Sequence, residues 1–243
     1  YRQAKQQVEG LLKTIGQLEE RRQKQATKPI APLIDSPLMA RLAMIVHSYA
    51  GALPEQRAEL LMKAIEALLS ADYELDPGAG QWLASQVGGD WRIHRDILQE
   101  VAFSMHRDEV LEIAERDLQS LLRRNHAGVA AAVIQVAKGR GGLLNEWNGR
   151  YRFVHPSLQH SLAACHLCAI RDPESLASFL VLGDRITLEW WREVAFLMAG
   201  YFTAATNPDR DEHKLTQFLL ALAERSRDME CPPVTRFACV EVA

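Results

Sequence analysis

The amino-acid sequence predicts a mostly α-helical protein with a helical domain, a winged-helix domain containing one small β-hairpin, and a C-terminal part of helical-bundle or α-solenoid type. Apolar residues recur at spacings of three and four in segment after segment, as in amphipathic helices. Only the stretch around Asn148-Gly149 has the turn pair and the short flanking runs of a hairpin. Proline and glycine concentrate between the periodic segments, which indicates loops there.

The composition is that of an ordinary globular protein. Of the 243 residues, 48% are hydrophobic and 24% are charged, and the formal net charge is −3. This charge balance provides no global electrostatic attraction to nucleic acid. No apolar run approaches the roughly 18 residues that cross a bilayer, and no signal peptide is recognisable, so we expect no membrane span and a cytoplasmic location.

Both ends of the sequence have the pattern of a chain interior. The first residue is Tyr1 rather than Met, and a helical pattern over residues 2–24 begins without a cap. The last residues, VTRFACVEVA, lie inside an apolar stretch without a closing signal. We therefore expect this chain to be a segment of a longer protein.

Residues 1–72 are predicted to form a first helical domain. Ser36 and Pro37 are an N-cap and first-turn pair for the second helix, which is expected to end near Ala50. Pro54 is expected to begin the third helix, whose apolar positions repeat at helical spacing.

Residues 73–90 are predicted to be a linker, because they contain five glycines and prolines and no sustained period. The winged-helix domain is expected over residues 91–171: three short helices in close order, a hairpin and a closing helix. The three helices are expected at residues 91–106, 108–124 and 127–138.

Residues 172–243 are predicted to form a second helical domain or the beginning of a helical sensor region. Asp172 and Pro173 are suited to start one short helix, and Thr187 is expected to cap a longer helix that follows. No repeat period is apparent in this part, so the choice between a bundle and a solenoid stays open.

The stretch YRFVHPSLQHSLAA joins the last strand of the hairpin to the closing helix through His155. Pro156 suits the first helical position, so His155 is expected just before a helix N-terminus. Free backbone N–H groups and the positive end of the helix dipole make such a position favourable for an anion such as phosphate. The alternative is a structural histidine with no ligand.

No catalytic site is predicted within this chain. The segment KGRGG, residues 138–142, is the only glycine-rich run with a lysine, but it follows a helix and reverses the order of a P-loop. Cys165-x-x-Cys168 supplies only two ligands on one helix, so no metal site is expected and both cysteines are expected to pack in the core. No Ser or Cys stands in a nucleophile elbow.

A winged helix also raises the alternative of a DNA-binding regulator. Its third helix, AGVAAAVIQVAK, would have to enter the major groove, yet it offers only Gln135 and Lys138 to read bases. Several arginines, including Arg150 and Arg152, could contact phosphates, although scattered surface charge is the simpler interpretation. Nucleic acid is therefore not the expected partner.

Two blocks of sequence together resemble NACHT-type STAND NTPases. The block IDSPLMARLAMIVHSYAGALPEQRAELLMKAIEALL is similar to the helical segment after the nucleotide-binding core of these proteins, with a Pro-Leu pair opening a helix. The block YRFVHPSLQHSLAACHL resembles the end of their winged-helix domain, with its aromatic-x-His pattern followed by Gln and an Ala-Ala pair. The two blocks lie in the order that this family has.

The resemblance implies a shared nucleotide site and a role in signalling. In this family ADP or ATP, with Mg in the full-length protein, is bound jointly with a P-loop domain that this chain lacks. Carried onto the matching positions, Pro37 would contact the adenine and His155 the β-phosphate of ADP. The segment itself would not be an enzyme, while the parent protein would be an ATPase. Expected partners are its own P-loop domain, further copies in an activated homo-oligomer and an unidentified trigger, in innate immunity or anti-phage defence.

Overall fold

The fold is mostly helical with one small antiparallel sheet, which confirms the predicted fold class. The computed structural model describes residues 2–25, 32–74, 91–137, 143–204, 207 and 210–227. In chain order the elements are α1 (Arg2–Gln25), α2 (Pro37–Ala50), α3 (Arg57–Glu74), α5 (Trp91–Arg107), β1 (Ile113–Ala114), α6 (Glu115–His126), α7 (Ala130–Ala137), β2 (Leu144–Trp147), β3 (Arg150–Phe153), α8 (Pro156–Ile170), α9 (Pro173–Val181), η1 (Arg185–Thr187), α10 (Glu189–Thr203) and α11 (Glu212–Arg227).

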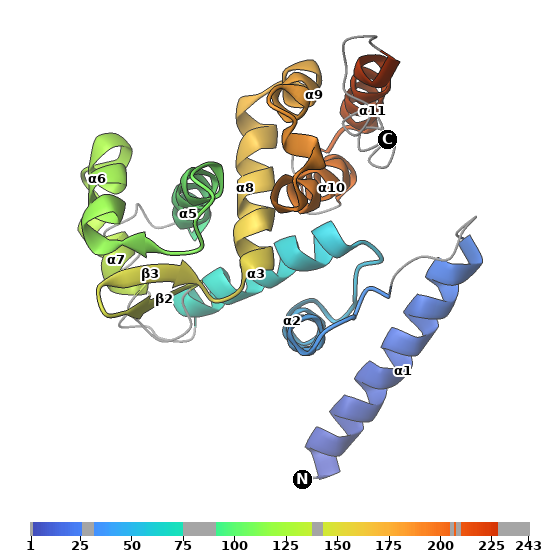
Figure 1. The fold of residues 1–243 in the computed structure, drawn as a ribbon. Helices are drawn as coiled ribbons and strands as arrows, with labels where there is room; N and C mark the ends of the chain where they lie inside the picture. The colour runs from blue at the N-terminus through green and yellow to red at the C-terminus, as the bar shows by residue number, and fades with distance from the viewer. Residues whose placement is uncertain are drawn as a thin grey trace.

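Helix α8 lies at the centre of the molecule (Figure 1). Helix α5 packs along one side of it, α10 packs along the other, and α3 crosses near its start. Side chains on almost every face of α8 are buried as a result: Ser157, Leu158, Gln159, Ser161, Leu162, Ala163, Ala164, Cys165 and Leu167. Near the end of α8, Ala169 is exposed and borders a cavity between α3, α5 and α10.

The segment from α5 to α8 has the connectivity that the winged-helix prediction requires. The order is helix, strand, helix, helix, strand, strand, and β3 lies between β1 and β2 in the three-stranded sheet. Ile113 pairs with Tyr151, and Leu144 pairs with Phe153. The turn between β2 and β3 has φ of 51° at Asn148 and 73° at Gly149, as expected for a type I′ hairpin.

The predicted second helix of this segment begins seven residues later than expected. Residues 108–114 are not helical: Ile113 and Ala114 form strand β1. Val110, inside the range predicted as helix, is 38% exposed, and its carbonyl accepts a hydrogen bond from the buried Gln159 side chain. Pairing with a strand nearly 40 residues away overrides the local helical period, which is why the sequence pattern was misleading here.

The C-terminal elements confirm one predicted cap and correct another. Asp172 accepts a hydrogen bond from the backbone N–H of Ser175 at 2.9 Å and caps α9, as predicted. Thr187, predicted to cap the next helix, instead ends a short 3₁₀ turn and donates its hydroxyl to the carbonyl of Asp184 at 2.7 Å. Leu188 occupies the N-cap position of α10 without a side-chain cap.

One continuous hydrophobic core extends from Leu18 in α1 to Leu222 in α11. This core includes residues on both sides of the domain boundaries predicted after residues 72 and 171. The division into domains therefore stays a prediction. Most of the predicted linker, residues 75–90, lies outside the described residues. Throughout the described part of the chain, no helix combines the length and apolar character needed to cross a membrane.

Helices α3 and α10 approach closely at Gly200. A Cβ atom at this glycine would lie 2.6 Å from the Cβ of Ala58, which is closer than two non-bonded carbon atoms can approach. We therefore expect Gly200→Ala to lower the free energy of unfolding by about 1–3 kcal/mol, measured by denaturant titration. Gly16→Ala in α1, where no atom lies within 4 Å of the added Cβ, should instead stabilise by about 0.5–1 kcal/mol.

A matched second substitution separates the steric cause from other effects. Ala58→Gly removes the facing methyl group, so it should be less harmful in the Gly200→Ala background than in the native chain. Equal effects in both backgrounds would show that close approach is not what requires Gly200.

His106 is a buried titratable side chain where α5, α8 and α10 meet. Its imidazole is fully buried, stacks on Trp190 with ring centres 4.8 Å apart, and meets Trp191 edge-on at 4.3 Å. Neither ring nitrogen has a hydrogen-bond partner in the described part of the chain. Burial, followed by the neighbouring His160, lowers the pKa of His106 to about 3. The ring is therefore neutral in the folded protein near pH 7.

Acid should destabilise the fold through His106. The unfolded chain takes up a proton below about pH 6.5, the ordinary pKa of histidine, while folded His106 stays neutral to about pH 3. Its contribution to stability is thus complete above pH 6.5 and declines as the pH falls. His106→Phe keeps an aromatic ring in place but cannot take up a proton. Between pH 6.5 and 4 we expect its free energy of unfolding to decline less than that of the native chain, with a difference on the order of 2 kcal/mol.

Thermal unfolding at a series of pH values checks this expectation. His94 and His160, whose pKa values burial lowers to about 4, should leave part of the acid sensitivity in the variant. His213→Phe, at an exposed position of α11, is the control and should leave the dependence of stability on pH unchanged. If the stability of His106→Phe declined with pH as steeply as that of the native chain, His106 would not be a source of the acid sensitivity.

Candidate functional site

His155 is the N-cap residue of α8, as its place before Pro156 predicts. Its backbone is extended, with φ −155° and ψ 145°, and its Nδ1 accepts a hydrogen bond from the backbone N–H of Ser157 at 3.1 Å. The N–H of Leu158 donates to the His155 carbonyl at 3.1 Å. The sequence led us to expect free N–H groups at this helix start, and the imidazole itself takes the first of them. A ligand would therefore meet the ring before it met the backbone.

The cap determines which nitrogen of His155 carries the proton. Because Nδ1 accepts from Ser157, the neutral ring must have its proton on Nε2. Burial and then the positive charge of Arg57 lower the pKa of His155, which favours this neutral form. The Nε2–H group has no hydrogen-bond partner among the described residues, so the ring presents one unoccupied donor at the start of α8.

Arg57 bonds a residue near Pro37 and acts through its charge on His155. It is the first residue of α3, and its guanidinium lies 2.9 Å from a carboxylate oxygen of Asp35 and 3.3 Å from one of Glu193. Asp35 stands two residues before Pro37, while the charge of Arg57 acts on His155. The sequence did not reveal Arg57, because nothing local marks a side chain that pairs with one residue before α2 and another on α10.

Pro37 is the first residue of α2 and its side chain is exposed. Ser36 precedes it as the predicted N-cap, accepting from the backbone N–H of Met39 at 3.2 Å. The exposed pyrrolidine ring is a small apolar surface beside the charged group formed by Asp35, Arg57 and Glu193. Such a surface can pack against a flat apolar group without competing for a hydrogen bond.

The two cysteines of α8 have the surroundings of core residues. Cys165 is 5% exposed, and burial raises the pKa of its thiol to about 12. Burial also raises the pKa of Cys168, followed by the influence of Cys165. Both thiols are therefore protonated near neutral pH and poor nucleophiles. Across the described residues, no group of three or more His, Cys, Asp or Glu side chains could hold a metal ion.

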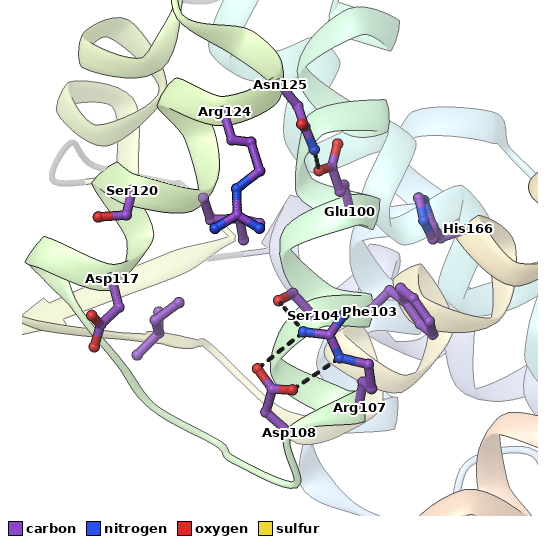
Figure 2. Close-up of a pocket in the computed structure, with 12 residues that line it drawn as sticks. Glu100, Phe103, Ser104, Arg107, Asp108, Asp117, Ser120, Arg124, Asn125 and His166 are labelled. Carbon is purple, nitrogen blue, oxygen red and sulfur yellow. Dashed lines mark hydrogen bonds and ion pairs between the residues drawn. The ribbon is translucent and has the colours of Figure 1, made fainter.

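A groove between α5 and α6 is a polar depression that the sequence did not reveal (Figure 2). It has a volume of about 600 Å³. Arg107 binds Asp108, with Nε 2.9 Å from the carboxylate, and Glu100 binds Asn125 and also His126 at 2.8 Å. Two sets of its polar side chains are thus already engaged with each other, while Asp117, Arg124 and His166 also line the groove.

The surfaces that a winged helix would use on DNA offer little for base reading. In α7 the side chains of Ala130, Ala132, Val133 and Ile134 are buried. In the hairpin, Arg150 lies 3.0 Å and Arg152 lies 4.0 Å from the carboxylate of Glu112, so both guanidiniums already have an acidic neighbour. Gln135 and Lys138, the two expected base readers, have no described side chains.

Comparison of the chain with protein-family models, with curated proteins and with solved structures found no match. The site must therefore be interpreted from its own residues. The Nε2–H donor of His155 has the chemistry of a phosphate contact, and exposed Pro37 has that of an apolar contact. The described ring of His155 offers one neutral donor, so most of the charge of a nucleotide would have to be met by another domain.

The cap function of His155 can be measured apart from any ligand. His155→Ala removes the acceptor for the Ser157 N–H, and we expect it to lower the free energy of unfolding by about 1 kcal/mol. His155→Asn and His155→Asp both restore a good cap and should stay close to the native value. Denaturant titration of the three variants checks this, and an alanine variant as stable as the asparagine one would exclude the cap.

Proposed function

We propose that this chain is the regulatory portion of a NACHT-type STAND signalling NTPase. The observation that supports it most is the single unoccupied Nε2–H donor of His155 at the start of α8. The winged-helix connectivity from α5 to α8 agrees with the place of this histidine in that family. The nucleotide would be ADP in the autoinhibited state, held jointly with a P-loop domain elsewhere in the parent protein.

In this proposal His155 is a neutral hydrogen-bond donor to the β-phosphate. Its lowered pKa keeps the ring uncharged, so the contact adds direction without adding a full positive charge. The P-loop domain and Mg²⁺ supply most of the charge that phosphates require. Pro37 packs against the adenine with its exposed ring. Arg57 positions both residues by holding the approach to α2 against α3 and α10.

A contact of this kind suits a switch. Only a ligand that binds one conformation more tightly than another can shift their populations. Loss of ADP would free His155 and allow the winged-helix segment to move away from the P-loop domain. The surfaces released would then support homo-oligomerisation in the cytoplasm, in innate immune or anti-phage signalling. The segment has no catalytic role in this scheme, and ATP hydrolysis belongs to the parent protein.

A winged-helix DNA-binding regulator is the competing function. Its weakness is the burial of most described side chains of α7 and the ion pairing of Arg150 and Arg152 with Glu112. Binding to mixed-sequence and selected DNA duplexes at several salt concentrations distinguishes the two functions. Tight, sequence-dependent binding would favour the DNA-binding regulator and overturn the proposal.

The role of His155 in nucleotide retention can be tested in the full-length protein. His155→Asn keeps a cap and an outward N–H donor, whereas His155→Asp keeps the cap but replaces the donor by a negative charge. We expect ADP affinity near the native value in the Asn variant and at least about tenfold weaker in the Asp variant. Calorimetric titration and the ADP content of purified protein both measure this.

Equal ADP retention in the native protein and in the Asp and Ala variants would contradict the phosphate contact. The coding sequence of the parent protein provides a separate test. A P-loop and a Walker-B carboxylate within about 200 residues upstream are required by the proposal. Their absence would exclude the NTPase assignment regardless of the behaviour of His155.

A further inference from the structure

Three arginine side chains converge on one pocket beyond the C-terminal end of α8. The pocket has a volume of about 810 Å³ and lies between α9, the turn at η1 and α11. Arg171 follows the last residue of α8, Arg185 begins η1, and Arg225 comes from the last turn of α11. Phe179 lies among them on α9.

Local contacts hold the three guanidiniums in place. The central carbon of the Arg185 guanidinium lies 4.5 Å from the ring centre of Phe179, and that of Arg171 lies 4.9 Å from it. Arg185 also donates to the carbonyl of Phe179 at 3.0 Å, and Arg225 donates to the hydroxyl of Ser178 at 3.1 Å. These interactions position the cations without neutralising them, because a ring face, a carbonyl and a hydroxyl carry no formal charge.

The pocket carries more positive charge than its acidic residues balance. None of the three arginines forms an ion pair with another described residue. Asp172 and Glu174 also line the pocket, so three guanidiniums stand with two carboxylates; the two oxygens of Asp172 accept hydrogen bonds from Ser175 at 2.9 Å and 2.6 Å. Three like charges around one opening repel one another, and an anion bound there would relieve that repulsion.

We propose that this pocket binds a small polyanion that carries several phosphate groups. Guanidinium groups match phosphate oxygens in geometry and form charge-assisted hydrogen bonds with them. Phe179 is already covered by guanidiniums and meets Trp191 edge-on at 5.3 Å, so its ring is not free to stack on a nucleobase. The phosphate groups, rather than a base, are what the pocket recognises.

This site is separate from the one at His155. The two stand at opposite ends of α8, whose 15 residues span about 22 Å. The polyanion site does not depend on the NTPase proposal, because its residues belong to α9, η1, α11 and the end of α8. One helix would nevertheless connect the two, so occupancy of the second site could be sensed at the first.

Isothermal titration with inorganic tripolyphosphate tests the proposal on the chain as it stands. We expect saturable binding that weakens at least about tenfold in Arg171→Gln and in Arg225→Gln, and weakens with added salt. Arg123→Gln, on the exposed surface of α6, changes the net charge equally and should alter the affinity less than twofold. His155→Asp should also bind tripolyphosphate like the native chain.

Three results would overturn the proposal. The first is the absence of measurable binding at millimolar tripolyphosphate by a protein whose melting curve shows it folded. The second is equal weakening by Arg123→Gln, which would indicate general charge attraction. The third is tighter binding of citrate than of tripolyphosphate, which would assign the pocket to carboxylates. Arg171→Lys keeps the charge without the planar fork, so partial retention of affinity in that variant would support recognition by guanidinium geometry.

Discussion

The burial of α8 on nearly every face is the constraint on which the rest of the structure depends. A helix without a polar side must be covered all round, so α5, α10 and α3 have to pack against it from different directions. That packing brings the segment from α5 to β3 and the C-terminal helices together into one continuous core. Other helices cover most of the flanks of α8, and the two sites proposed for ligands lie at its two ends.

The start of α8 combines two demands on one side chain. His155 satisfies the Ser157 N–H with Nδ1, and the same hydrogen bond leaves the proton of the neutral ring on Nε2. Burial and Arg57 favour this neutral form by lowering the pKa. The helix cap thus prepares the ligand contact, and the direction of the free donor follows from local geometry rather than from a separate binding loop.

The far end of α8 has a different electrostatic character. At its start the single Arg57 stands with Asp35 and Glu193, whereas at its end Arg171 lines a pocket with two further arginines and two carboxylates, Asp172 and Glu174. A helix buried along its length transmits small displacements between its ends, because a close-packed interior resists compression. If both proposed ligands bind, α8 is the element through which each would influence the other.

The sequence by itself determined the helical content, the Asn148-Gly149 hairpin, the caps at Ser36 and Asp172, and the helix start at Pro156. Each depends on residues within one or two turns of each other, so local chemistry suffices. Only the tertiary structure decided that residues 108–114 are not helical, that the charge of Arg57 acts on His155, and that three arginines line one pocket with Phe179. These features depend on contacts between segments tens of residues apart. The local pattern of apolar residues does not indicate which distant side chains will be in contact.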